Sequence, residues 1–215
     1  SNVVSDTTLA SLTLALAGGW TMFGLSARPT NTDLPTWLGI SGLPSYQCRV
    51  VRWSPGGSAY VDEPSSDPLL DAAEGKAFWV WLASGRTPEA LGQKFPLAET
   101  LLIPLTSGWN QIAEPFADAS IYWSSVEVKE RSQTIEQSVG LEDPAAAALV
   151  ADYGWVYQDG EYRLVHGVIG DIHEIEPWEG LWIWAKQDCD LVVSGQPRAM
   201  APTEGRTRAP RLKWL

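Results

Sequence analysis

The stretch Gly180-Leu-Trp-Ile-Trp-Ala-Lys186 has a near copy in the same chain, Gly75-Lys-Ala-Phe-Trp-Val-Trp-Leu-Ala83. Each is an apolar run in which tryptophans stand at alternate positions. Because successive side chains on a strand point to opposite faces, the two tryptophans of each run share a face. Phe78, Val80 and Ile183 would fill the opposite face, so both faces are apolar. This pattern predicts two strands that are covered on both sides rather than half-exposed to water.

The segments that precede these two runs also correspond to each other. The matching pairs are residues 11–16 with 100–105 and residues 20–24 with 109–113. The chain is therefore interpreted as a tandem repeat, with a first β repeat over residues 9–96 and a second over residues 97–195. A length of 215 residues suits either one large all-β domain or two domains of about 100 residues each.

Most of the other elements read as strands joined by tight turns. Ser54-Pro-Gly-Gly57 and Gln158-Asp-Gly160 separate apolar runs, so each predicts a hairpin. The one helix expected covers residues 143–152, where Asp143 would cap an Ala-rich segment. The predicted fold is all-β: two tandem homologous β-sandwich-like repeats with one short helix in the second. A propeller is disfavoured because the chain has only two repeats.

The charge balance restricts the partners. Lys and Arg total 15 against 26 for Asp and Glu, which gives a net charge of -11. Such a protein would be repelled by nucleic acid and by anionic membranes. No apolar run approaches the roughly 20 residues of a membrane span. Residues 196–215 differ because they are basic and rich in Pro and Arg; we expect a tail or linker, or an arm that lies on an acidic surface.

Few residues suggest catalysis or metal binding. Cys48 and Cys189 match no metal-ligand spacing, and either one disulfide or two reduced buried thiols is compatible with the sequence. His166 and His173 fit no zinc pattern, and no nucleophile elbow or phosphate loop is present. We therefore expect no enzyme and no cofactor. Ca2+ is the sole metal for which ligands are suggested, without diagnostic spacing, by the loop carboxylates Asp62, Glu63, Asp67, Asp171 and Glu174.

The second repeat carries several short motifs in a fixed order. They are Gly108-Trp-Asn-Gln-Ile-Ala-Glu-Pro115, Ile121-Tyr-Trp123, Trp155-Val-Tyr157, Pro177-Trp-Glu-Gly-Leu-Trp-Ile183 and Asp188-Cys-Asp-Leu191. Together they resemble a Gly-Trp-Asn / Pro-Trp-x-Gly-Tyr-Trp-type β repeat of bacterial secreted and cell-surface proteins. The first repeat matches less well, because it lacks the Asn after Trp20 and the Asp-Cys ending. The resemblance implies an all-β extracellular module, usually appended to larger surface proteins, with no catalytic residues to carry over.

The 12 tryptophans have two expected roles, because proteins bury these rings or use them at interfaces and on ligand platforms. Those on the repeated strands, or following turn glycines, are expected in the structural core: Trp20, Trp79, Trp81, Trp109, Trp182 and Trp184. Aromatic residues beside turn-forming residues are the candidates for ligand binding, because binding groups concentrate on loops. These are Trp37, Trp53, Tyr60, Trp123, Trp155, Tyr162 and Trp178.

These observations favour a non-catalytic extracellular β module that mediates cell-surface assembly or adhesion through protein–protein contacts. Its expected partners are other surface proteins or copies of itself, and its expected location is the exterior or cell surface of a bacterium. The alternative is a carbohydrate-binding module that uses loop-borne Trp and Tyr residues, with glycans as partners.

Overall fold

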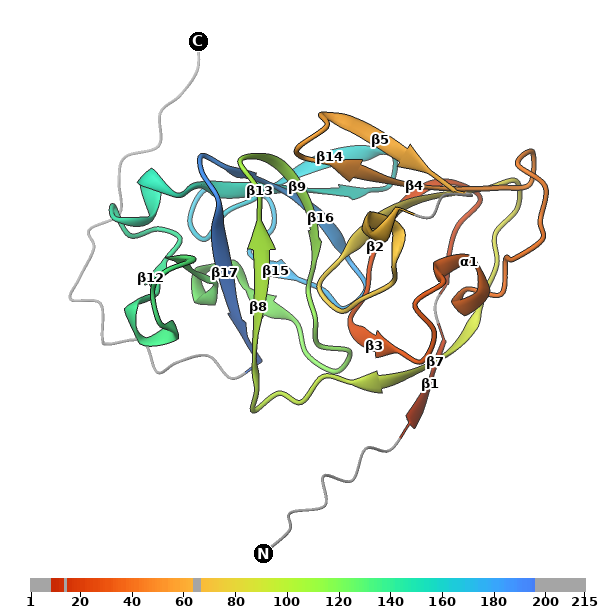
Figure 1. Ribbon diagram of the computed structural model, residues 1–215, viewed down its shortest axis with the longest axis horizontal. Helices are drawn as coiled ribbons and strands as arrows, with labels where there is room; N and C mark the ends of the chain where they lie inside the picture. Colours follow the sequence, from red (N-terminus) through yellow and green to blue (C-terminus); the bar gives the residue numbers. More distant parts are fainter. Residues whose placement is uncertain (1–8, 14, 64–66, 196–215) are drawn as a thin grey trace, which may run out of the picture.

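The computed structural model describes residues 9–13, 15–63 and 67–195, and these residues form an all-β protein, as the sequence predicts. In Figure 1 the first half of the chain (residues 9–96) lies mostly on the right and the second half (residues 97–195) mostly on the left. The proposed tail, residues 196–215, lies outside the described residues. None of the helices in the described part is both long and apolar enough to span a membrane.

The described residues of the first half form two sheets. Its strands are β1 (Leu9–Thr13), β2 (Gly19–Gly24), β3 (Ala27–Pro29), β4 (Cys48–Ser54), β5 (Ala59–Asp62), β6 (Ala77–Leu82) and β7 (Glu89–Lys94). They pair in the orders β1-β7-β3 and β2-β6-β4-β5, always antiparallel. The helix α1 (Leu34–Trp37) and the 3-10 helix η1 (Pro68–Leu70) lie in the connections.

The second half follows a related plan with longer connections. Its strands are β8 (Thr100–Leu105), β9 (Gly108–Ala113), β10 (Ile121–Tyr122), β11 (Glu127–Glu130), β12 (Val139–Gly140), β13 (Val150–Gln158), β14 (Glu161–Val165), β15 (Glu174–Ile175), β16 (Gly180–Ala185) and β17 (Cys189–Ser194). They pair in the orders β12-β11-β17-β8, β14-β13-β16-β9 and β10-β15. The 3-10 helices are η2 (Trp123–Ser125), η3 (Ile135–Gln137) and η4 (Ala146–Ala148).

The two sheets that contain the Trp-rich strands have corresponding strand orders, and β2 with β6 has the same register as β9 with β16. They differ in the next pair, because β13 has a register shift against β16 between Val150 and Gly154, whereas β4 pairs with β6 without one. In the first half Trp20 stands opposite Trp81 across β2 and β6. In the second half Trp109 stands opposite Trp184 across β9 and β16. Residues that occupy the same place in the two registers are called corresponding residues below. This arrangement is the one that a tandem repeat predicts, and common ancestry of the halves stays a prediction.

The prediction of a helix over residues 143–152 is wrong. The Asp143 carboxylate accepts a hydrogen bond from the Ala145 amide at 2.8 Å, but only the 3-10 helix η4 follows, and β13 begins at Val150. Val150 is buried and pairs with Ala185 of β16. Pairing with the sheet therefore overrides the helix propensity of the alanines. The described α-helix, α1, lies instead in the first half, where the Asp33 side chain caps it.

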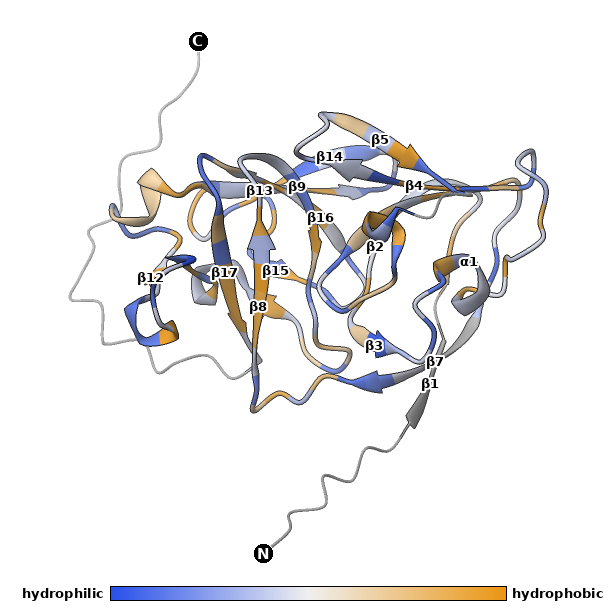
Figure 2. Ribbon diagram, in the orientation of Figure 1, coloured by the Kyte–Doolittle hydropathy of each residue, from blue (hydrophilic) through white to orange (hydrophobic). Residues whose placement is uncertain are grey.

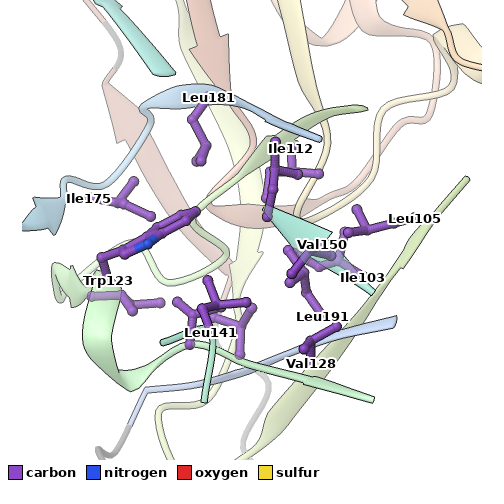
Figure 3. Packing of buried hydrophobic residues seen from close by; sticks show 14 of the residues in the cluster. Ile103, Leu105, Ile112, Trp123, Val128, Leu141, Val150, Ile175, Leu181 and Leu191 are labelled. Carbon is purple, nitrogen blue, oxygen red and sulfur yellow. The ribbon is translucent and has the colours of Figure 1, made fainter. Parts of the chain in front are cut away.

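Each half has its own hydrophobic core, and a third cluster joins them. The core of the second half packs around Trp123, whose ring lies among Ile175, Leu141 and Leu181 (Figure 3). In Figure 2 the hydrophobic colouring of β16 and β17 marks strands that contribute to this core. The joining cluster combines Met22, Val51 and Trp79 of the first half with Trp182 of the second, and half-buried aromatic residues pack against it.

Backbone hydrogen bonds fix the two halves to each other. The Gly24 amide donates to the Trp178 carbonyl at 2.8 Å, and the corresponding Ala113 amide donates to the Gly75 carbonyl at 2.9 Å. The Ser26 hydroxyl adds a polar link, because it accepts from the Trp178 amide at 2.7 Å. Each half therefore donates one backbone hydrogen bond to the other, and the donors and acceptors of the two bonds are corresponding residues. The halves are therefore docked through a reciprocal contact, like the isologous interface of a dimer.

Candidate functional site: an aromatic groove

Two hollows lie side by side where the Trp-rich sheets of the two halves meet. The first, called the aromatic hollow, has a volume of about 440 Å³ and is lined by Trp53, Tyr60, Trp109, Trp155, Tyr162 and Trp182. The second, called the Arg49 hollow, has a volume of about 460 Å³ and is lined by Trp20, Arg49, Val51, Tyr60, Asp62, Trp79, Tyr157 and Tyr162. Because Tyr60 and Tyr162 line both, the two hollows form one aromatic groove.

The hairpins of the two halves place these rings by their registers. Trp53 of β4 stands opposite Tyr60 of β5, and Tyr157 of β13 stands opposite Tyr162 of β14. The second register is set by a two-residue turn in which Asp159 has φ 54° and the following glycine φ 88°. Directly opposed side chains on antiparallel strands are close enough to pack. Each tyrosine is therefore held against an aromatic partner at the edge of its sheet, where β5 and β14 approach each other in Figure 1.

The rings of the aromatic hollow meet edge to face. The Trp182 ring is 6.0 Å from the Trp53 ring at an interplanar angle of 75°, and 6.3 Å from the Trp109 ring at 82°. Trp53 in turn meets Tyr60 at 5.3 Å and 73°. These are favoured aromatic geometries, so the rings support one another without a bound molecule. The rings that line the hollow consequently face it in several orientations.

Exposure rises from the floor of the groove to its rim. The floor residues Trp79 and Trp182 are each 8% exposed, whereas Tyr60 is 47% and Tyr162 is 51% exposed. Partial burial, with the neighbouring Tyr162, raises the pKa of the Tyr60 phenol. Partial burial likewise raises the pKa of the Tyr162 phenol. Both hydroxyls therefore stay protonated at neutral pH and can donate hydrogen bonds at the rim.

A buried polar pair anchors the floor beneath the rings. Gln111 is 1% exposed, and its side-chain oxygen accepts from the Trp53 amide at 2.5 Å. The Arg52 guanidinium donates to the Gln111 carbonyl at 3.1 Å and to the Ala77 carbonyl at 3.2 Å. Burial lowers the pKa of Arg52 to about 10, which still leaves it charged at neutral pH. The two bonds to Gln111 cross between the halves, so they fix Trp53 relative to the second half.

Four of the seven candidate ligand-binding residues come together in the aromatic hollow: Trp53, Tyr60, Trp155 and Tyr162. Two others are misassigned. Trp123 is fully buried, with its indole N–H donating to the Asp152 carbonyl at 2.8 Å, and Trp37 is 5% exposed in the core of the first half. The seventh, Trp178, is half-buried beside Trp37 at the junction of the halves, with a backbone φ of 69°.

The tryptophans expected in the core divide into three groups by exposure. Trp79 and Trp182 are buried as expected, and Trp81 and Trp109 are half-buried. Trp20 is 42% and Trp184 is 38% exposed, so their assignment to the core is wrong. Both stand toward one end of their strands, beyond the area that the opposite half covers.

Sequence reasoning missed that core and loop aromatic residues line the same groove. Trp109 and Trp182 were expected only in the core, yet they form the aromatic hollow with the loop-side residues. Arg49 and Tyr157 were not among the candidate binding residues, although they line the Arg49 hollow. The available signal was the hairpin register, which puts Tyr157 opposite Tyr162 once the Asp-Gly turn is recognised.

The described residues contain no group of three or more His, Cys, Asp or Glu side chains placed to hold a metal ion. Of the suggested calcium ligands, Asp62 pairs with Arg49 at 2.7 Å, and the Asp67 side chain caps η1. The others are Glu63 after β5, Asp171 in a loop, and Glu174 in β15.

The histidines and cysteines have structural surroundings. His173 Nδ1 donates to the His166 carbonyl at 2.7 Å, which holds both within one loop. Cys48 and Cys189 are free thiols, so of the two sequence alternatives the structure has the unbridged one. Burial raises the pKa of the Cys189 thiol to about 11, which keeps it protonated and unreactive at neutral pH.

Comparison with known proteins finds no matching family model, no similar curated protein and no similar solved structure.

Proposed function

We propose that this protein is a non-catalytic binding module that mediates cell-surface assembly or adhesion, and that its partner protein docks into the aromatic groove. The observation that carries the proposal is the aromatic hollow, whose six lining side chains are all Trp or Tyr. Trp and Tyr are enriched among the residues that dominate binding energy at protein interfaces. The resemblance of the second repeat to bacterial surface modules supports the location.

The shape of the groove favours binding over chemistry. The floor is buried and held by edge-to-face contacts, so a guest would meet rings that are already ordered. Rigid aromatic side chains lose little conformational freedom on binding, which leaves more of the contact energy for affinity. The aromatic hollow offers no carboxylate, imidazole or thiol among its lining residues. The one carboxylate that lines the Arg49 hollow, Asp62, forms an ion pair with Arg49.

The test compares rim variants with a matched control. Tyr162→Ala removes an exposed ring shared by both hollows, and Tyr46→Ala removes an exposed ring (71% exposed) that lines neither hollow. Beads coated with each purified protein are scored for attachment to cells of the producing bacterium. We expect Tyr162→Ala to lose most of the attachment and Tyr46→Ala to keep it. Equal attachment of Tyr162→Ala and the wild type, with both folded, would contradict the proposal.

Carbohydrate binding is the second candidate, favoured by the combination of ring faces with polar groups at the rim. Sugars stack on aromatic rings and also need hydrogen-bond partners, which Tyr60, Tyr162 and the Arg49–Asp62 pair could supply. A glycan array and quenching of tryptophan fluorescence by soluble polysaccharides separate the candidates. A millimolar sugar response that disappears in Tyr162→Ala would favour the glycan. No response leaves the protein partner as the better proposal.

A further inference from the structure

The two hollows are built from corresponding residues of the two halves. Trp109 occupies in the aromatic hollow the place that Trp20 occupies in the Arg49 hollow, since each stands opposite the outer tryptophan of its Trp-rich strand. Trp182 and Trp79 correspond in the same way as the inner tryptophans of β16 and β6. Each hollow thus has one exposed or half-exposed wall ring and one buried floor ring in matching positions.

The other aromatic residues that line the two hollows also correspond between the halves. Tyr60 stands opposite Trp53, and Tyr162 stands opposite Tyr157, so the two tyrosines correspond and each lines both hollows. Trp53 lines only the aromatic hollow, and its counterpart Tyr157 lines only the Arg49 hollow. The same set of corresponding aromatic positions, called the aromatic frame, therefore occurs twice in the groove, once in each hollow.

The two copies of the frame differ in charge. Opposite the floor tryptophans, Val51 of the first half corresponds to Trp155 of the second. The next residue across each hairpin is Asp62 in the first half and Leu164 in the second. Arg49 is present only in the lining of the Arg49 hollow. The Arg49 hollow is therefore lined by an ion pair as well as by rings, whereas the aromatic hollow is lined by Trp and Tyr side chains alone.

The Arg49 hollow shows what the frame can hold. The Arg49 guanidinium lies over the Trp20 ring, 5.9 Å from its centroid, which is within the range of a cation–π interaction. Its charge is also paired with Asp62 at 2.7 Å. Within the described part of the chain, no arginine lies over Trp109, the corresponding ring of the aromatic hollow. Among the described residues, the chain therefore places an arginine of its own, Arg49, over the ring of the Arg49 hollow and none over the ring of the aromatic hollow.

We propose that the aromatic hollow receives an arginine side chain of the partner protein, which lies over Trp109 as Arg49 lies over Trp20. This inference rests on the proposed function and adds the chemistry that the partner must bring. Trp155, in place of a valine, adds a ring face that the Arg49 hollow lacks.

Arginine fits this hollow better than lysine for a physical reason. A guanidinium is planar and weakly hydrated, and it stacks on aromatic faces, whereas an ammonium is compact and strongly hydrated. The hollow offers no carboxylate to repay the hydration that a lysine would lose, because Leu164 stands where the other half has Asp62. The net charge of -11 attracts a positively charged partner toward the surface before the ring contacts form.

Three short peptides that differ at one position test the inference. They carry arginine, lysine or citrulline, which has the shape of arginine without its charge, and binding to the full protein is followed by tryptophan fluorescence and calorimetry. We expect the arginine peptide to bind about tenfold more tightly than the citrulline peptide, and the lysine peptide to lie between them. Equal affinities for arginine and citrulline, or no binding at millimolar concentrations, overturn the inference.

Two corresponding variants locate the effect. Trp109→Leu should abolish the preference for arginine over citrulline, because it removes the ring beneath the cation. Trp20→Leu makes the same change in the Arg49 hollow and should leave the preference intact. Trp155→Val, which installs the residue found at the corresponding position, is the second variant if Trp109→Leu does not fold. A preference that survives both Trp109→Leu and Trp155→Val places the arginine elsewhere and overturns the inference.

The attachment assay keeps the two proposals apart. If Tyr162→Ala loses attachment while the peptides show no preference for arginine, the arginine inference fails and the proposed function stands. If Tyr162→Ala attaches normally, the proposed function fails, and the arginine inference fails with it.

Discussion

The first and second halves place their tryptophans in one register, yet they touch each other through residues that differ in size. Gly24 and Ala113 correspond, and so do Ala77 and Gly180. A Cβ added to Gly24 would lie 2.3 Å from the Ala113 Cβ, and one added to Gly180 would lie 2.9 Å from the Ala77 Cβ. In each contacting pair one half has glycine and the other alanine. Two identical halves with alanine at these places could not dock this closely.

The polar residues at the junction differ between the halves as well. Glu114 of the second half is 2% exposed, and its corresponding residue in the first half is the fully buried Leu25. Gln111, which binds the Trp53 amide, corresponds to Met22. The comparison teaches that the halves share their plan in the Trp-rich sheets, while the corresponding residues at the junction differ and are complementary in size and polarity.

The largest expected effect comes from removing a floor tryptophan. Trp182→Ala deletes a ring that packs against Trp53 and Trp109, so we expect a loss of about 3–5 kcal/mol in the free energy of unfolding. Trp79→Ala, at the corresponding position, should cost a similar amount. Trp184→Ala should cost only about 1 kcal/mol, because this ring is 38% exposed. Denaturant titration measures all three, and an equal loss for Trp184 and Trp182 would contradict the dependence of stability on the burial of these rings.

A pH-dependent effect of a few kcal/mol is expected at Glu114. Burial raises the pKa of Glu114 to about 9, so the folded protein favours the protonated form. Protonated Glu114 therefore contributes fully to the free energy of unfolding below pH about 4.5. This contribution is lost as the pH rises toward 9, because the carboxyl group of the unfolded chain releases its proton at a lower pH than that of the folded protein. Stability of the wild type should therefore fall across this range by on the order of a few kcal/mol.

Glu114→Gln tests this assignment, since an amide keeps an acceptor for the Phe116 amide and does not titrate. Denaturant midpoints measured from pH 5 to 9 should show a smaller decline in the variant than in the wild type. Parallel declines would show that other groups cause the pH dependence.

Gly24→Ala should have a smaller effect, about 1–3 kcal/mol, because it forces two Cβ atoms into contact at the junction. The control is Gly56→Ala, where an added Cβ meets nothing within 4 Å. Thermal melting compares the two variants. A Gly24→Ala protein as stable as the Gly56→Ala control would mean that the junction relaxes easily and that the size difference between the halves is not required for docking.

The strands and hairpins followed from sequence because their signals are local. Alternating tryptophans identified β6 and β16, and the Asp159-Gly160 turn fixed the hairpin that carries Tyr162. The failed helix shows the limit of local signals, since the alanines before Val150 favour a helix that the neighbouring strand β16 replaces.

The groove was not predictable from the same signals. Alternation shows that Trp182 and Trp184 share a face, but not how far the opposite half covers that face. One is buried and the other exposed because the cover ends between them. Trp123 lies beside turn residues, which suggested a surface ring, but it is buried and its indole N–H donates to the Asp152 carbonyl of β13. Such outcomes depend on contacts between segments distant in sequence.

The division of the aromatic hollow between the halves has a further consequence. Trp53 and Tyr60 come from residues 9–96, and Trp109, Trp155, Tyr162 and Trp182 come from residues 97–195. Neither half alone supplies all the rings of the hollow, so a molecule bound there would contact both halves at once. Its binding free energy would then add directly to the cohesion of the pair, and loosening the pair would weaken its hold on the guest.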